Sequence, residues 1–174
     1  MLNDLEEGDR MQILVFALVE PRYALYLSAV ERVIQAVEIT RLPVEHRFIL
    51  GVIDMQGQVI PVVDIRPCFG MPAREVNQND LFILARTSTR LIALVADSVA
   101  GIHEMTRQEL VTASQLLPGM AYIHSLAKVE GELVLICDLD QFLSREDEKR
   151  LEAALKVNSE KAGRRKQRKV SEAA

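Results

Sequence analysis

A short pattern occurs twice in this sequence and constrains its fold more than any other feature. Residues 57–65 and 131–139 each begin with a glycine, continue through an apolar run and place an aspartate, Asp64 or Asp138, at the eighth position. The two glycines and the two aspartates are both 74 residues apart. A shared spacing at two fixed points indicates an internal duplication. We therefore expect two related lobes in one chain.

Runs of strand-forming residues alternate with turns over most of the chain. Glycine, proline and asparagine mark the turns, and Gln56-Gly57 is a tight turn of the kind that joins two antiparallel strands. The expected hairpins are 11–19 with 23–27, 49–55 with 58–65, 81–85 with 91–96, and 122–129 with 133–139. The fold class is therefore mainly β, with the strands closed into small barrels that hide their edges.

Three capping patterns predict short helices between or after the strands. Ser28 and Glu31 precede apolar residues at helical spacing and predict a short helix to about residue 37, although its β-branched content favours an extended end. Thr106 with Glu109 predicts a helical turn. Ser144 with its acidic partner three residues later predicts a C-terminal helix over 145–157.

The expected domain organisation follows from these elements and from the charge distribution. Residues 1–10 are polar and acidic and are expected to be disordered; lobe 1 spans about 11–70 and lobe 2 about 80–143, and an exchange of strands between them remains open. Residues 156–174 carry seven lysines and arginines against two glutamates, whereas residues 1–155 carry 14 against 23 acidic residues. We expect 158–174 to be a basic, disordered tail on an acidic body.

Composition argues against several classes of function. An acidic body with no tryptophan lacks the charge and the stacking rings of a nucleic-acid-binding barrel. The early apolar run at 13–19 is far shorter than the ~20 residues that span a bilayer, so we expect no membrane insertion and a cytoplasmic protein. Cys68 and Cys137 lie in apolar stretches and are expected to be reduced thiols that pack as small hydrophobic groups.

The sequence offers no convincing catalytic or metal site. His46, His103 and His124 are not spaced as metal ligands, so no metal and no cofactor are expected. A carboxylate pair between the lobes, Asp64 with Asp138, is conceivable, but we expect each aspartate to accept backbone N–H groups at the end of its strand. We therefore predict that the protein is not an enzyme and acts as an interaction module.

An ordered series of motifs resembles the bacterial chemotaxis coupling protein family, CheW. The matching segments are ILVFAL at 13–18, YAL at 23–25, the stretch 30–34, ITRLP at 39–43, GVIDMQG at 51–57 and VIPVVDIR at 59–66. The likeness covers about residues 11–157. It implies two tandem SH3-like, five-stranded β-barrel lobes around a shared core, with short helices and a C-terminal helix.

The resemblance also implies a function and its partners. Members of this family are non-enzymatic adaptors in chemosensory signal transduction. They join the cytoplasmic tip of methyl-accepting chemotaxis receptors to the regulatory domain of the histidine kinase CheA. The same roles are expected for this chain, with a receptor helix in an apolar groove and the kinase on an exposed strand edge.

Two sets of site residues are carried over from the family, residue by residue. The receptor-binding groove between the lobes would involve Val30, Arg32, Gly51, Gln56, Gly57, Val95 and Val99. The kinase-binding surface would involve Val37, Glu38, Ile39, Arg41 and Leu42.

The chain departs from the family at two of these positions. The family usually has Asn-Leu-Arg-Gly where this chain has Asp54-Met55-Gln56-Gly57, and a glutamate where this chain has Arg32. Gln56 can hydrogen-bond but cannot make a charge-assisted bidentate contact. Three hypotheses follow: an adaptor for receptor and kinase, a scaffold of kinase rings that does not bind receptor, or a ligand-binding protein or enzyme that uses the cleft between the lobes.

Overall fold

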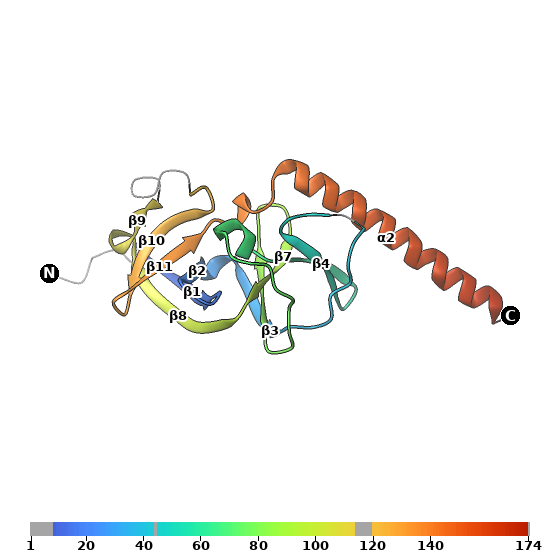
Figure 1. Ribbon diagram of the computed structural model, residues 1–174, viewed down its shortest axis with the longest axis horizontal. Helices are drawn as coiled ribbons and strands as arrows, with labels where there is room; N and C mark the ends of the chain where they lie inside the picture. Colours follow the sequence, from blue (N-terminus) through green and yellow to red (C-terminus); the bar gives the residue numbers. More distant parts are fainter. Residues whose placement is uncertain (1–8, 44, 114–119, 174) are drawn as a thin grey trace.

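The computed structural model describes residues 9–43, 45–113 and 120–173 of the chain. Two β-sheets lie side by side and a long helix, α2, leaves the body at one end (Figure 1). The expectation of a disordered segment at 1–10 falls largely outside the described residues. The strands are β1 (Arg10–Ala17), β2 (Arg22–Tyr26), β3 (Val30–Gln35), β4 (Ile49–Met55), β5 (Gln58–Val63), β6 (Leu81–Arg86), β7 (Leu91–Ala96), β8 (Ser98–Thr106), β9 (Val111–Thr112), β10 (Ile123–Val129) and β11 (Glu132–Cys137), and α2 spans Arg145–Glu172.

The two lobes exchange their first strands, so the expected boundaries at 11–70 and 80–143 are wrong. Lobe A is the sheet β8-β1-β2-β11-β10-β9, and lobe B is the sheet β3-β6-β7-β5-β4. Each lobe therefore takes one hairpin from the other half of the chain: β1 and β2 enter lobe A, and β6 and β7 enter lobe B. The exchange that the sequence left open is the arrangement observed, and it prevents either half from forming a complete sheet alone.

The duplication is visible in the strand pairing. The first five positions of lobe A, β8-β1-β2-β11-β10, repeat the order β3-β6-β7-β5-β4 of lobe B, and each lobe joins its two hairpins by a parallel pair, β11 with β2 or β5 with β7. The register shift between Ile49 and Gly51 recurs 74 residues later between Ile123 and Ser125. The predicted tandem, mainly β architecture is confirmed, with the short strand β9 as an addition to lobe A.

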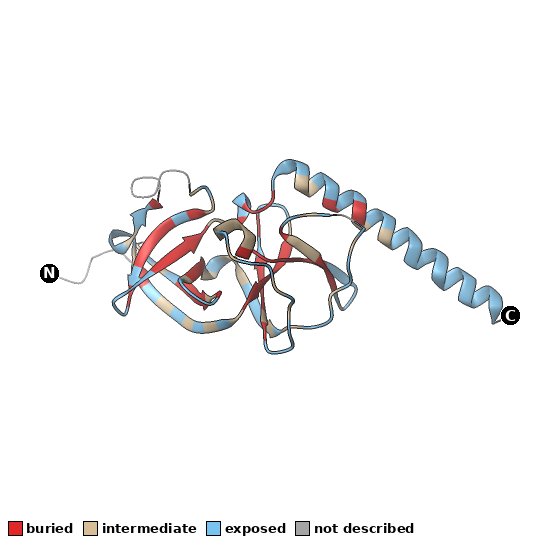
Figure 2. Cartoon of the chain, viewed as in Figure 1, coloured by how far each residue is buried: buried red, intermediate tan, exposed pale blue. Residues whose placement is uncertain are grey.

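Side chains alternate between three apolar layers, as the two-residue period of strands requires. One face of β7 (Leu91, Ala93, Val95) fills lobe B, and the other (Ile92, Leu94, Ala96) joins a central cluster shared with lobe A. Lobe A has its own small cluster around Ile13, Val15 and Ile136. Figure 2 shows the resulting buried strands and the exposed α2. The shared core makes the two lobes one folding unit.

The predicted helix at 28–37 is wrong. A short 3-10 turn at Leu27–Ala29 leads directly into β3, whose residues pair with β6 from Val30↔Ala85 to Gln35↔Leu81. The apolar residues of this segment are mostly β-branched and pack well on a pleated surface, and the edge of lobe B supplies the hydrogen bonds that a helix would have made internally. Tertiary pairing therefore overrides the helical spacing.

The C-terminal helix is longer than predicted. Its capping box forms as expected, with the Ser144 hydroxyl accepting from Asp147 N and the Asp147 carboxylate accepting from Ser144 N. The helix then continues through residue 157 to Glu172, so the expectation of a disordered tail over 158–174 is wrong for 158–172. Lysine, arginine, glutamine and alanine dominate this stretch and all have high helix propensity, which apolar periodicity alone does not reveal.

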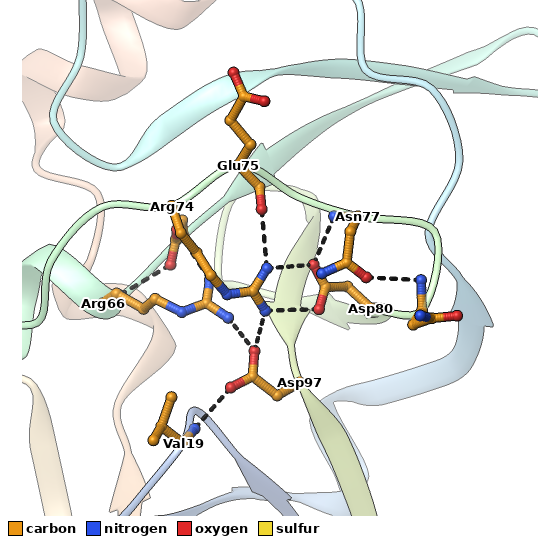
Figure 3. A network of polar contacts seen from close by, with 9 residues as sticks. Val19, Arg66, Arg74, Glu75, Asn77, Asp80 and Asp97 are labelled. Carbon is orange, nitrogen blue, oxygen red and sulfur yellow. Dashed lines mark hydrogen bonds and ion pairs between the residues drawn. The ribbon is translucent and has the colours of Figure 1, made fainter.

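A partly buried ionic network stabilises the junction between the lobes (Figure 3). Arg66, 2% exposed, bonds to the Asp64 carboxylate at 3.1 Å and to Asp97, and Asp97 Oδ2 accepts from Val19 N at 2.7 Å. Arg74 reaches the same Asp97 and makes a bidentate pair with Asp80. The network therefore links the end of β5, the β1–β2 turn, the β7–β8 corner and the connection between β5 and β6.

Candidate functional site

A surface hollow on lobe B brings all five predicted kinase-binding residues together. It has a volume of about 980 Å³, and its lining includes Val37, Glu38, Ile39, Arg41 and Leu42. Val37 is 49% exposed. Apolar side chains from β4 and from the β5–β6 connection (Ile49, Leu50, Val76) complete the wall. A hollow lined by apolar side chains together with charged ones has the composition of a protein-binding surface rather than of a catalytic pocket.

The segment that carries these residues is held to β4 by its backbone. Thr40 and Val52 exchange two N–H···O=C bonds of 2.8 Å each, an isolated bridge at the open edge of lobe B. Gly51 permits this close approach, because a Cβ built there would lie 2.3 Å from the Thr40 carbonyl oxygen. Gly51 also has φ +152°, which favours glycine. Gly51 thus supports the predicted kinase-binding surface.

The opposite wall of the hollow is the connection between β5 and β6. Arg74 fixes this wall, since its guanidinium binds Asp80 at 2.7 and 2.8 Å and the carbonyl oxygen of Glu75 at 2.9 Å. Burial alone would raise the pKa of Asp80, but the bonds from Arg74 and from Asn77 N hold it below its ordinary value. Asp80 therefore stays ionised and the wall stays tied to the junction network.

A histidine connects the hollow to the start of α2. His46 Nδ1 accepts from the backbone N–H groups of Phe48 and Ile49 at 3.0 and 3.2 Å, so the proton of the neutral ring is on Nε2. Nε2 lies 2.8 Å from Asp147 Oδ1 and donates to it. Asp147 belongs to the capping box of α2, so one carboxylate orders both the helix start and the loop that borders the hollow.

The contribution of the Asp147 carboxylate to the stability of the fold should depend on pH. Burial alone would raise the pKa of Asp147, but bonds from Ser144 and His46 outweigh it and hold the pKa below its ordinary value. A depressed carboxyl pKa stabilises the fold above the unfolded pKa, about 3.9, and this contribution is lost as the pH falls through the folded value. We expect Asp147→Asn to lower the free energy of unfolding by about 1 kcal/mol at pH 7.

The difference in unfolding free energy between Asp147→Asn and the intact chain should shrink as the pH falls from 5 to 3. Thermal unfolding followed by circular dichroism across that range measures it. Because other carboxylates titrate equally in both proteins, a difference that stays constant or grows would show that the charge of Asp147 does not stabilise the helix start.

The predicted receptor-binding residues are not gathered in one groove. Val30 and Val99 are half-buried and pack against the shared core, at equivalent places on β3 and β8, and Arg32 is exposed on β3. Val95 is fully buried inside lobe B and Gly51 is buried beside Thr40. The prediction that Val95 and Gly51 line a groove is therefore wrong, since neither is free to touch a partner.

Gln56 and Gly57 form the exposed turn between β4 and β5. Both have positive φ, +55° and +85°, and Asp54 Oδ1 accepts from Gly57 N at 2.8 Å. Strands β3 and β4 are the two opposite edges of the lobe B sheet, so this turn and the β3 residues Val30 and Arg32 belong to different edges. Asp54 is committed to shaping the turn, which leaves Gln56 as its free polar side chain.

The two repeated aspartates have the structural role that the sequence predicts. Asp64 Oδ1 accepts from Arg66 N at 3.0 Å, and Asp138 Oδ1 accepts from Asp140 N at 3.2 Å, again 74 residues apart. Asp64 is 3% exposed and bound to Arg66, so it is not available as a general base. This geometry argues against a hydrolytic site that uses the carboxylate pair.

The thiols and the described carboxylates and histidines also offer little chemistry. Both cysteines are free, and burial raises the pKa of Cys68 to about 12 and raises that of Cys137 as well. Within residues 9–43, 45–113 and 120–173, no group of three His, Cys, Asp or Glu side chains is placed to hold a metal ion. Among the same residues, no helix is long and apolar enough to cross a membrane.

The sequence did not reveal one wall of the hollow. Residues 71–79 lie outside both expected lobes and were given no role in either predicted site, yet they supply the wall formed by Arg74, Glu75, Val76, Asn77 and Gln78. The one sequence clue was an arginine and an aspartate, Arg74 and Asp80, in a stretch otherwise rich in turn residues. Arg74 also binds Asp97, which is distant in sequence, and no local pattern predicts this contact.

The relatives of this chain agree with its fold. A family model described as a CheW-like domain matches residues 12–147. Proteins named chemotaxis protein CheW from Thermotoga maritima and Bacillus subtilis are 27% identical over 132 residues and 26% identical over 149 residues. These matches cover 76% and 84% of this chain and 87% and 94% of the two relatives.

A solved structure extends the likeness to three dimensions. The crystal structure of the scaffolding protein TtCheW from Thermoanaerobacter tengcongensis has a TM-score of 0.72 and 25% sequence identity, covering 79% of this chain and 94% of that chain. The match leaves about a fifth of the present chain outside it. Given the family-model match over most of its length, this chain belongs to the CheW-like domain family.

Proposed function

We propose that this chain is a chemosensory adaptor that couples methyl-accepting receptors to the regulatory domain of the histidine kinase CheA in the cytoplasm. The observation that carries the proposal is the hollow on lobe B, where Val37, Glu38, Ile39, Arg41 and Leu42 share one surface. Its segment is fixed by the Thr40–Val52 bridge, and His46 orders the loop that follows, so the surface is preorganised for a partner. The family assignment supports an adaptor and requires no catalytic step.

The receptor side of the proposal rests on the junction between the lobes. Val30 and Val99 present half-buried apolar side chains there, and β3 and β8 add exposed Val33 and Ile102. A helix with an apolar stripe binds such a surface through side chains at i, i+3 and i+4. The family usually has a glutamate at the position of Arg32. Arg32 would therefore need an acidic residue of the receptor as its partner.

A scaffold of kinase rings without receptor binding is the second candidate. It is favoured by the dispersal of the carried-over groove residues: Val95 and Gly51 are buried and Gln56 lies on another edge from Arg32. Gln56 also replaces the usual arginine of the family and cannot make its charge-assisted contact, which again favours a scaffold without receptor binding. This candidate shares the kinase contact and differs only in the receptor contact.

The kinase contact is testable by charge reversal in the hollow. Arg41→Glu and Leu42→Asp place a new charge at the rim and in the apolar wall, and we expect each to weaken binding of the kinase regulatory domain at least about tenfold. Lys128→Glu makes the same charge change as Arg41→Glu on an exposed position of lobe A and is the matched control. Calorimetric titration measures the affinities.

Equal affinities for Arg41→Glu, Lys128→Glu and the unchanged chain would exclude the hollow as the kinase-binding surface. Thermal unfolding shows whether each variant is folded. Arg41 is exposed, so we expect its replacement to leave the core intact.

A further inference from the structure

The outer half of α2 is a solvent-exposed arm that no other described element covers. From residue 159 to 173 every side chain is exposed, and Figure 1 shows the helix pointing away from both lobes. Only Leu151 and Ala154 of the helix are buried. The arm, residues 159–172, is about 20 Å long, and it lies outside the region that matches the family model. It is therefore an addition to the shared fold.

Four cations of the arm form one line. Lys161, Arg164, Arg165 and Arg168 have the spacing i, i+3, i+4 and i+7, which places them on a single face of a helix. We call this face the basic stripe. Among the described residues, Arg168 is the one member of the stripe in an ion pair, with Glu172 at 3.9 Å, and both side chains are largely exposed. The stripe thus presents several unneutralised cations in a fixed row.

The arm is unlike a membrane-binding helix. Its side opposite the stripe carries Ser159, Gly163, Lys166 and Val170, and the apolar residue that lies one turn from Val170 among the described residues is the small Ala173. Interfacial helices need an apolar face to enter the headgroup region. The stripe therefore fits an anionic partner held by charge.

The complementary charge is present on the body of the same protein. Residues 1–155 have nine more acidic than basic residues. Glu38, Glu45 and Glu75 line the hollow of lobe B, are exposed and have no ion pair within the described part of the chain. Of the three arginines that line the hollow, Arg74 binds Asp80, Arg47 donates to the Pro67 carbonyl oxygen, and Arg41 has no ion pair among the described residues. The three available carboxylates therefore outnumber by one the two arginines, Arg41 and Arg47, whose charge no described carboxylate neutralises.

We propose that the basic stripe of one copy docks on the three available carboxylates of the hollow, Glu38, Glu45 and Glu75, in a second copy. The arm is a continuous helix that points away from its own lobes, so it meets the carboxylates of another molecule. Such a contact is head-to-tail and repeats from copy to copy. Exposed ion pairs are individually weak and screened by salt, so the association is weak and depends on ionic strength.

Sedimentation velocity over a concentration series tests the proposal. We expect the intact chain to associate at about 50 mM salt and to dissociate at about 300 mM. Removing three stripe charges (Lys161→Gln, Arg164→Gln, Arg168→Gln) should weaken association at least about tenfold. The matched control removes three charges from the other side of the helix (Lys149→Gln, Lys156→Gln, Lys166→Gln) and should associate like the intact chain.

A charge-swap experiment identifies the acceptor. Lys161→Glu with Arg165→Glu in one protein, and Glu45→Lys with Glu75→Lys in another, should each prevent self-association, whereas a mixture of the two should associate. Circular dichroism confirms that each variant is folded. A chain that is monomeric at every concentration, a stripe variant that associates like the intact chain, or a mixture that stays monomeric would overturn the proposal. Stripe-dependent binding of a monomer to DNA or to anionic vesicles would also overturn it.

Discussion

Replacing Arg66 by methionine should lower the free energy of unfolding by about 3–5 kcal/mol, because it leaves a buried charge without its partner. Arg66 is 2% exposed and pairs with Asp64, whose side chain is 4% exposed. Asp97 keeps its bond to Arg74 in this variant, so the unpaired group is Asp64. Methionine fills a similar volume, which limits the contribution of an empty cavity.

Urea unfolding measures this loss, and two further variants isolate its cause. Arg66→Met combined with Asp64→Asn removes both charges and keeps a side-chain oxygen that accepts from the backbone N–H of residue 66. This double variant should recover much of the stability. Arg150→Met removes an arginine from the exposed pair with Glu146 and should cost about 1 kcal/mol at most. If Arg66→Met were no more harmful than Arg150→Met, the junction network would not hold the lobes together.

Replacing Gly51 by alanine should destabilise the fold by about 2–4 kcal/mol and displace the predicted kinase-binding segment. The added Cβ would lie 2.3 Å from the Thr40 carbonyl oxygen and 2.7 Å from Ile39 Cγ2, at a backbone φ of +152°. Relief of this overlap requires the segment to leave β4 and the Thr40–Val52 bridge to break. We therefore expect a lower kinase affinity even at temperatures where the variant is folded.

Gly101→Ala is the matched control for Gly51→Ala. Gly101 also has a φ that L-residues rarely adopt, +128°, but an added Cβ would have nothing within 4 Å. Both variants carry backbone strain, and only Gly51→Ala carries the clash. The difference in unfolding free energy between the two, from urea titrations, measures the clash. Equal stability and equal kinase affinity would show that the approach of Thr40 to β4 does not order the segment.

Local rules of sequence predicted most strands and turns. The four hairpins and the caps at Thr106 and Ser144 form as expected, because turn residues and capping side chains act over a few residues. The role of Asp64 and Asp138 followed from the repeat, since a duplicated backbone bond needs the same residue in both copies.

Three of the errors share one cause, which is pairing between distant segments; the unexpected length of α2 reflects helix propensity instead. The stretch after Ser28 has helical spacing, yet an edge of lobe B, built from β6, turns it into β3. Lobe boundaries were placed by sequence order, whereas β1 and β2 complete lobe A, whose other strands come from the second half of the chain. Val95 was assigned to a groove by family resemblance, but β7 is the central strand of lobe B and buries both faces.

Calorimetric titration of the intact chain into the regulatory domain of its cognate kinase, with and without a receptor tip fragment, tests the coupling role most directly. The proposed adaptor should bind the kinase domain alone and the receptor tip alone, and should hold both in one complex. Binding of the kinase without the receptor would establish the ring scaffold instead. Binding of neither partner would contradict the coupling function and leave the hollow on lobe B without its proposed ligand.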